Sequence, residues 1–423
     1  MGEVFLKLFN MSIAAGWLIL FVLLLRLLFR KMPSWVRCIL WAIVAFRLLC
    51  PFSLESMFSL IPSGEILSAD TVRYAAAPAI TSGISSLDGA LNPVISQVFA
   101  PEPVSSVNPL YVVMYLAGLV WLIGLLLLIG YALFGYLRLK RRVREAVHLR
   151  DNIWVCDAVT SPFLFGVINP KIYLSSTGED SQQTYVLAHE QAHLKRKDHW
   201  WKLLGYLLLS VYWFHPLVWA AYFLFCRDIE LACDEKVIRE FDVSEKKAYC
   251  HALLSCGMQR TLLFTCPLSF GEVSVKKRVK SILHYRKPAA FVTIGALVLC
   301  AAVALCFLTN PAPKYYLNHV DPSEVSAITV FDGNNGQGFT ITDPQEITVI
   351  VENIQSIPVK RENWSLTHSG YRFRMTFTDQ SGKEITQFIL NSDNNIRKDP
   401  FFYSSQGGFC YSYIEELEQR YLS

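Results

Sequence analysis

Residues 181–195 read Ser-Gln-Gln-Thr-Tyr-Val-Leu-Ala-His-Glu-Gln-Ala-His-Leu-Lys. The stretch contains no Gly or Pro, so we expect an uninterrupted α-helix. Within it, His189 and His193 are four residues apart, which puts both imidazoles on one helix face, where they can chelate one zinc ion. Glu190 follows the first histidine, and its carboxylate can take a proton from a water that zinc has acidified to a pKa of about 7. The stretch therefore predicts a hydrolytic zinc centre, although the same pattern also arises by chance in ordinary helices.

A second stretch supplies the missing ligand. Residues 227–235 read Arg-Asp-Ile-Glu-Leu-Ala-Cys-Asp-Glu, and Glu230 and Asp234 are again four residues apart, so they share a helix face. Glu230 can complete a site of two histidines and one glutamate, and Asp234 can accept the other N–H of a ligand imidazole. The alternative is a solvated acidic helix, but the histidine pair upstream favours the ligand interpretation.

The composition indicates a membrane protein. Of 423 residues, 52% are apolar and only 17% are charged, whereas about a quarter of the residues in soluble domains are charged. The formal net charge is only +4, so the chain as a whole gives no sign of nucleic-acid binding. Four nearly uncharged runs approach the ~20 residues with which a helix crosses a bilayer. They are residues 8–25, 38–54, 109–137 and 288–313.

Basic residues orient these spans, because membrane loops rich in Lys and Arg stay in the cytoplasm. They cluster at 26–37, 138–144 and 276–287, all on one side if every run spans the membrane. The 51–108 loop has one basic and five acidic residues, and we expect little structure in it. The predicted organisation is two transmembrane helices in 1–50, an extracellular loop at 51–108, a third transmembrane helix at 109–137, a cytoplasmic metallopeptidase domain at 138–287, a fourth transmembrane helix at 288–313 and an extracellular domain at 314–423.

Residues 203–226 are also uncharged, but we predict a re-entrant or membrane-seated helical hairpin here and not a further span. His193 and Glu230 can meet at one zinc ion only if the chain between them crosses the membrane an even number of times. This run of 24 residues is too short for two spans of about 20 each, and Pro216 interrupts it in the middle. His215 is therefore interpreted as a turn residue and not as a fourth ligand.

Four motifs in order carry a family resemblance: residues 161–174, 189–199, 213–219 and 230–235. Together they resemble the BlaR/MecR-type antirepressor metallopeptidases over roughly residues 1–310. The resemblance implies a cytoplasmic zinc endopeptidase, regulated from outside, that inactivates a DNA-bound repressor. It also implies His189, His193 and Glu230 as zinc ligands, Glu190 as general base and acid, and Asp234 as the group that orients a ligand.

The chain departs from this family after residue 310. The β-lactam sensors of the family carry SxxK and KTG motifs in a larger C-terminal domain, and 314–423 contains neither. The Ser-Asp-Asn sequence at 392–394 follows a strand pattern and is interpreted as a turn. We expect a small α+β domain with strands at 326–332, 338–342, 371–378, 384–391 and 408–413, a hairpin turn at 379–382 and a helix at 414–421. It either senses something other than a β-lactam or serves as a passive anchoring or dimerising domain.

The expected fold class is a multi-pass α-helical membrane protein with a cytoplasmic α+β gluzincin-type zinc peptidase domain and a small extracellular α+β domain. The predicted function is cleavage of a cytoplasmic transcriptional repressor in response to an extracellular signal. A housekeeping membrane metalloprotease and a non-proteolytic signalling receptor that keeps the fold are the alternatives. The expected partners are membrane lipid and the repressor, without direct nucleic-acid contact, and a homodimer is left open. The basic linker 265–287 is either a self-cleavage site or a helix that binds anionic lipid.

Overall fold

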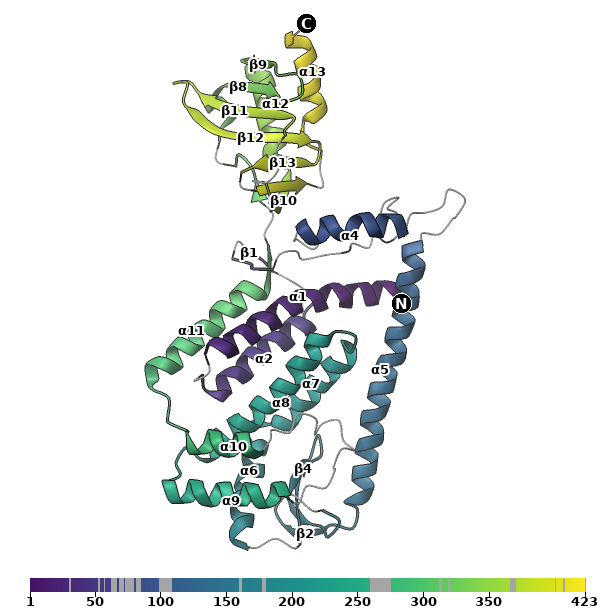
Figure 1. Ribbon diagram of the computed structural model, residues 1–423, viewed down its shortest axis with the longest axis vertical. Helices are drawn as coiled ribbons and strands as arrows, with labels where there is room; N and C mark the ends of the chain where they lie inside the picture. The colour runs from purple at the N-terminus through teal and green to yellow at the C-terminus, as the bar shows by residue number, and fades with distance from the viewer. Residues whose placement is uncertain are drawn as a thin grey trace. The chain divides into compact units, whose positions relative to one another are not determined.

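The computed structural model describes most of the chain (Figure 1). It forms two compact units, residues 1–53 with 109–308 and residues 54–108 with 309–423, and each is described by itself. The described residues are those of 1–423 outside 30–31, 52–53, 57, 62–66, 68–71, 73–79, 81–84, 99–108, 160–161, 177–179, 259–274, 312–313, 319, 366–369, 400, 406–407 and 423.

Among the described residues, three helices of the first unit are long and apolar enough to cross a membrane: α1 (Gly2–Leu28), α5 (Pro109–Arg142) and α11 (Ala290–Phe307). They coincide with the first, third and fourth predicted spans. The predicted span at 38–54 falls on α2 (Ser34–Leu49), which has only 16 residues, fewer than the ~20 that usually cross a bilayer. α2 packs against α1 and α11, and its membrane crossing stays a prediction.

Two helices form the hairpin expected around residues 203–226. α7 (Asp198–Val211) and α8 (Pro216–Val237) are joined by a short turn, and Pro216 occupies the first turn of α8, where its missing N–H leaves no hydrogen bond unmade. His215 lies at this turn. Its ring packs on Gly16 of α1 so closely that a Cβ added there would lie 3.3 Å from Nε2. The seating of the hairpin in a membrane stays a prediction.

A small sheet and three helices complete the first unit. The sheet has the strand order β2-β3-β5-β4, and the predicted strand segment at 161–174 contains its last two strands. Helix α6 packs against α8 and α9, so the histidine helix lies at the centre of this region. The elements are β2 (Val147–Arg150), β3 (Ile153–Val155), β4 (Phe163–Phe165), β5 (Lys171–Leu174), α6 (Asp180–Arg196), α9 (Val243–Met258) and α10 (Val275–Leu283).

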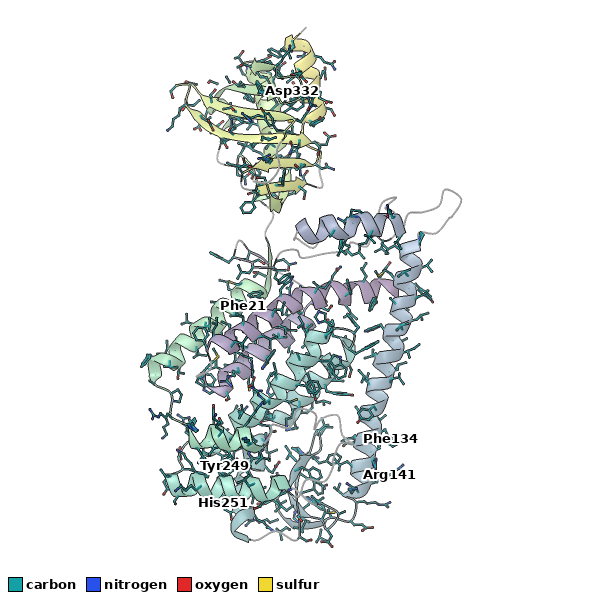
Figure 2. All side chains as sticks on the ribbon, in the orientation of Figure 1. Phe21, Phe134, Arg141, Tyr249, His251 and Asp332 are labelled. Atoms are coloured by element: carbon teal, nitrogen blue, oxygen red, sulfur yellow. The ribbon has the colours of Figure 1, made fainter. Side chains whose placement is uncertain are left out.

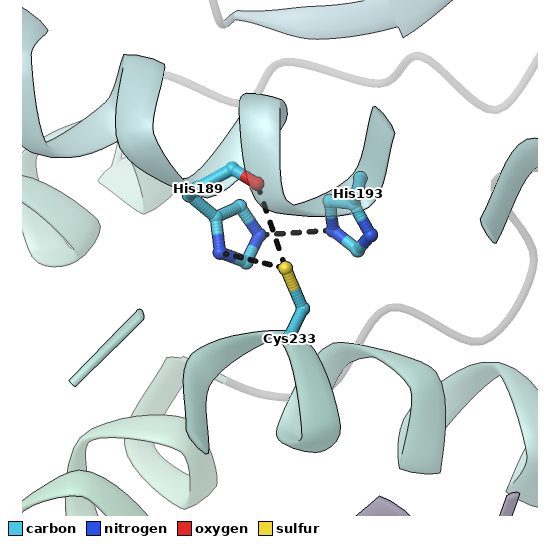
Figure 3. Close-up of side chains that lie close together, drawn as sticks. All are labelled: His189, His193 and Cys233. Carbon is cyan, nitrogen blue, oxygen red and sulfur yellow. Dashed lines mark hydrogen bonds between the residues drawn. The ribbon is translucent and has the colours of Figure 1, made fainter. Parts of the chain in front are cut away.

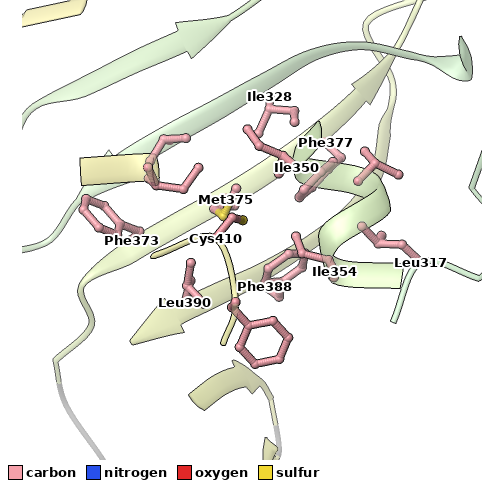
Figure 4. Packing of buried hydrophobic residues seen from close by; sticks show 14 of the residues in the cluster. Leu317, Ile328, Ile350, Ile354, Phe373, Met375, Phe377, Phe388, Leu390 and Cys410 are labelled. Carbon is pink, nitrogen blue, oxygen red and sulfur yellow. The ribbon is translucent and has the colours of Figure 1, made fainter. Parts of the chain in front are cut away.

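The C-terminal domain is built on one eight-stranded sheet with the order β7-β10-β14-β13-β12-β11-β8-β9. In β8, Ile328, Val330 and Asp332 are buried and the residues between them are exposed, so the strand has one core face. Helices α12 and α13 complete the apolar core (Figure 4). The elements are β7 (Lys314–Tyr315), η2 (Pro322–Glu324), β8 (Val325–Asp332), β9 (Gly338–Ile341), α12 (Pro344–Ser356), β10 (Pro358–Trp364), β11 (Phe373–Asp379), β12 (Glu384–Ser392), β13 (Asn395–Lys398), β14 (Phe401–Ser405) and α13 (Tyr411–Leu422).

The predicted elements of this domain are mostly present. The strands at 326–332, 338–342, 371–378 and 384–391 match β8, β9, β11 and β12, and the chain turns at 379–382 and at 393–394. The strand predicted at 408–413 is wrong, because α13 already begins at Tyr411. The apolar residues Phe409 and Cys410, which suggested a strand, pack in the core just before this helix begins.

The 51–108 loop contains more structure than its composition suggests. Helix α4 spans Ser85–Val98, and the Asn92 side chain bonds the backbone N–H and carbonyl of Ile80 at 2.8 and 3.1 Å. Strand β1 (Leu54–Ser56) pairs in parallel with β6 (Thr309–Pro311), which follows α11. The expectation of little regular structure therefore fails at 54–56 and 85–98.

Candidate metal centre

Both histidines of α6 are buried and face each other across one helical turn. The Nε2 atoms of His189 and His193 lie 3.1 Å apart, and the rings are only 5% and 7% exposed (Figure 3). The helical spacing expected from the sequence therefore brings the two Nε2 atoms close together. Glu190 is next to His189 on the same helix and is also buried.

Glu230 brings a carboxylate from α8 to the same point. Its Oε2 is 3.6 Å from Nε2 of His189, and its Oε1 is 3.5 Å from Nε2 of His193. Two ligands bound tetrahedrally to zinc at 2.0–2.1 Å are about 3.3 Å apart. The three donor groups thus have the chemistry and the mutual spacing that a zinc ion requires, and the structure brings together all three residues predicted as ligands.

His193 is held from behind by a residue whose role the sequence did not reveal. Its Nδ1 lies 2.7 Å from Oδ2 of Asp198, which is 3% exposed. Lys197 adopts a left-handed conformation (φ 58°) between α6 and α7, and this turns the chain so that Asp198 folds back onto the histidine. A carboxylate at this position fixes the imidazole with Nε2 free for a metal. The only sequence signal was an aspartate five residues after the second histidine.

The Nδ1 atom of His189 contacts a tyrosine, which is in turn hydrogen-bonded to an aspartate. Tyr249, which comes from α9 (Figure 2), has its hydroxyl 2.8 Å from Nδ1 of His189 and donates to Oδ1 of Asp234 at 2.8 Å. Burial and then the charge of Asp234 raise the pKa of Tyr249 well above its ordinary value, so the phenol keeps its proton. Asp234 itself is 3.4 Å from Nδ1. Asp234 therefore reaches His189 through Tyr249, which the sequence did not indicate, and its role behind a metal ligand stays a prediction.

Two cations balance the buried acids. Lys202 of α7 donates to Oε1 of Glu230 at 2.9 Å, and Arg278 of α10 contacts Asp234 at 2.6 Å. Burial alone would raise the pKa of Glu230, but Lys202 and then His193 lower it well below its usual range. Glu230 is therefore ionised, which is the state that a carboxylate needs in order to bind a metal.

Cys233 is a further donor near the histidines. Its Sγ lies 3.6 Å from Nδ1 and 3.5 Å from the carbonyl oxygen of His189, and its donor atom and one from each histidine all fall within 4.8 Å of one another. The sulfur approaches His189 from the Nδ1 side, whereas Glu230 faces both Nε2 atoms. Cys233 and Glu230 are thus both near enough to serve as a third donor, and the assignment of Glu230 stays a prediction.

The opposite face of α8 is anchored to the N-terminal helices. Asp228, which is fully buried, pairs with Arg26 of α1 and accepts a hydrogen bond from Nε1 of Trp41 at 2.8 Å. Glu235 accepts from the backbone N–H and hydroxyl of Ser34 at the start of α2. These contacts fix the rotation of α8, and with it the direction of Glu230.

Comparison with known proteins identifies the family. The model of the BlaR1 peptidase M56 family matches residues 6–282, the larger part of the chain. The methicillin resistance mecR1 protein of Staphylococcus aureus is 23% identical over 220 residues, which are 45% of this chain and 37% of that protein. The regulatory protein BlaR1 of Bacillus licheniformis is 26% identical over 244 residues, 50% of this chain and 40% of that protein. The matched region thus spans less than half of either relative. Sequence, histidine pair and family match agree, and the chain belongs to the BlaR1 peptidase M56 family.

Proposed function

We propose that this protein is a membrane-embedded zinc endopeptidase of the gluzincin type that cleaves a cytoplasmic transcriptional repressor in response to an extracellular signal. The observation that carries the peptidase part is the convergence of His189, His193 and Glu230 at distances that suit one zinc ion. The regulatory part is supported by family membership and by the similarity to BlaR1 of Bacillus licheniformis, which is described as a regulatory protein.

Each buried residue of the centre has a distinct part in peptide hydrolysis. A zinc ion held by the three ligands supplies Lewis acidity toward the scissile carbonyl. Glu190 takes a proton from the attacking water and passes it to the leaving amine. Asp198 and the Tyr249–Asp234 pair keep the Nε2 atoms of the two histidines directed at the metal position.

The decisive experiment compares the wild-type chain with Glu190→Gln. The substitution keeps all ligands and removes the base, so we expect unchanged zinc content, measured by elemental analysis, and loss of proteolysis. Proteolysis is followed on the chain itself and on any DNA-binding repressor whose gene is found beside that of this chain. Fragments that vanish in Glu190→Gln report self-cleavage, and identical fragments in both chains point to other proteases.

The control is the same substitution at another glutamate, Glu240→Gln. Glu240 is exposed and lies just after the end of α8, so the change should affect neither zinc content nor proteolysis. Full peptidase activity in Glu190→Gln would remove Glu190 from the mechanism. Loss of zinc in that variant would contradict the ligand assignment. Zinc binding with no cleavage in the wild type would favour the non-proteolytic receptor, and cleavage of many unrelated membrane proteins would favour the housekeeping protease.

The topology is proposed from the basic clusters, with the metal centre in the cytoplasm and 314–423 outside. Cys410 is buried and is a poor reporter, so we choose exposed positions for engineered cysteines. A thiol reagent that cannot cross membranes should label Thr340→Cys on intact cells and should label Lys277→Cys only after the cells are opened. The reverse pattern would contradict the topology.

A further inference from the structure

Helix α10 is a basic helix with one buried cation. Lys276, Lys277 and Lys280 are exposed, whereas Arg278 is only 5% exposed and Ile282 is 1% exposed. α10 packs against α9 and α8 and is followed in the chain by α11 (Figure 1). A solvated or lipid-binding basic helix needs no arginine on its inner face, so Arg278 requires its own explanation.

The guanidinium of Arg278 lies beside the metal ligands. Its Nε and one terminal nitrogen donate to the two oxygens of Asp234 at 2.8 and 2.6 Å, a bidentate pair. That nitrogen is also 3.1 Å from Nε2 of His189, and the other terminal nitrogen is 3.4 Å from Oε2 of Glu230. No exposed lysine of α10 could replace this contact, because a planar fork is needed to hold both oxygens at once.

Asp234 is 2% exposed and acts on His189 through Tyr249, as described above. A buried carboxylate keeps its charge and its orientation only if a cation and hydrogen bonds compensate it. Lys202 compensates Glu230, and among the described residues Arg278 makes the shortest contact of any cation with Asp234. The direction of Nδ1 in His189 therefore depends on where α10 holds Arg278.

We infer that Arg278 is a positioning residue of the metal centre: it fixes Asp234, Asp234 and Tyr249 fix His189, and the centre thereby depends on the placement of α10. The inference rests on the proposed metallopeptidase function. It also gives α10, which lies in the 265–287 linker, a structural role besides that of a possible cleavage site. A displacement of α10 would lower the affinity for the metal without touching a ligand.

The test measures metal affinity, and it needs no peptidase activity. Full-length protein carrying Glu190→Gln, which removes self-cleavage, is titrated with Co²⁺ in competition with a chelator, and the visible absorption of the bound cobalt is recorded. We expect Arg278→Gln to weaken binding by about 10- to 100-fold, the usual loss when a group behind a ligand is removed. Arg278→Lys should fall between, because an ammonium keeps the charge but cannot hold both oxygens. Lys277→Gln, an exposed neighbour with the same charge, should bind as the parent does.

A double-mutant cycle separates positioning from a merely structural ion pair. If Arg278 acts through Asp234, Arg278→Gln should add little to the loss already caused by Asp234→Asn. Full additivity, or an affinity of Arg278→Gln equal to that of Lys277→Gln, would overturn the inference. If Arg278→Gln does not fold, the cycle is run with Arg278→Lys, and the same two outcomes decide. His189→Ala tests the premise separately: undiminished cobalt binding in that variant would refute the metal centre itself.

Discussion

The candidate metal centre and the C-terminal domain differ in how many ionisable side chains they bury together. Around the histidines, the buried groups include two imidazoles, several carboxylates and a guanidinium, whereas the C-terminal domain has a large aliphatic and aromatic core and buries only a few acids, such as Asp332 and Glu418. Burying ionisable groups costs free energy even when they are paired, and burying apolar groups supplies it. The difference indicates that the first region is arranged for chemistry and the second for stability, so mutations in the two should have separable effects.

The largest expected effect is on the stability of the C-terminal domain. Phe377 on β11 is fully buried, so Phe377→Ala should destabilise this domain by about 3–5 kcal/mol, through lost burial and the cavity left behind. Hydrogen exchange of the strands in the full chain measures the change. Phe331→Ala is the control, because that ring is 38% exposed on the other face of the sheet. Metal affinity should be the same in both variants. A lower metal affinity in Phe377→Ala would show that the two regions are not independent.

The next effect concerns the metal centre alone. Asp198→Asn replaces the acceptor behind His193 with an amide and should weaken metal binding by about 10- to 100-fold. Chelator competition measures the affinity, and hydrogen exchange of 325–390 should not change. Asp157→Asn, at an exposed aspartate of the same unit, serves as the control. An affinity of Asp198→Asn that matches this control would show that Asp198 does not support the ligand.

The smallest expected effect is the absence of a reaction. Acylation by a penicillin requires a serine activated by a nearby base, and no serine in 314–423 has a lysine three residues further on. Labelled penicillin incubated with the full chain should therefore give no stable covalent adduct in this domain. Stable labelling there would contradict the view that the domain differs in function from the β-lactam sensors.

Deleting 314–423 then tests whether the domain is a sensor at all. If the domain reports the extracellular signal, the truncated chain should still bind zinc but should cleave the repressor without regard to that signal. Unchanged regulated cleavage would assign the domain a passive role and leave the 51–108 loop as the next candidate.

The pairing of the candidate ligands on helix faces was predictable from the sequence because helical periodicity is a local property. His189 with His193, and Glu230 with Asp234, follow from a spacing of four. Tyr249 and Arg278 reach the same point from helices far along the chain, and no periodicity encodes a contact between helices. The position of Asp198 depends on the left-handed backbone of Lys197, which no sequence pattern indicates, because left-handed positions usually favour Gly or Asn.

The C-terminal domain shows the same contrast. β8 and β11 were predictable because apolar and other residues alternate along each strand, and the apolar residues form its buried face. α12 was not predicted, because its many Ile and Val residues suggest a strand. It is a helix because Asp343 caps it, Pro344 starts it, and Ile347, Ile350 and Ile354 share its buried face.

The three-residue ladder between β1 and β6 determines what a cut in the 265–287 linker would do to the chain. It joins Leu54–Ser56 to Thr309–Pro311, and the Ser59 hydroxyl donates to the Thr309 carbonyl at 2.7 Å, so segments on both sides of the 265–287 linker are tied without a covalent bond. Within the first unit, Arg47 adds a contact to the carbonyl of Leu308. The two fragments of a chain cut in this linker would therefore stay associated in mild detergent and would separate only on a denaturing gel.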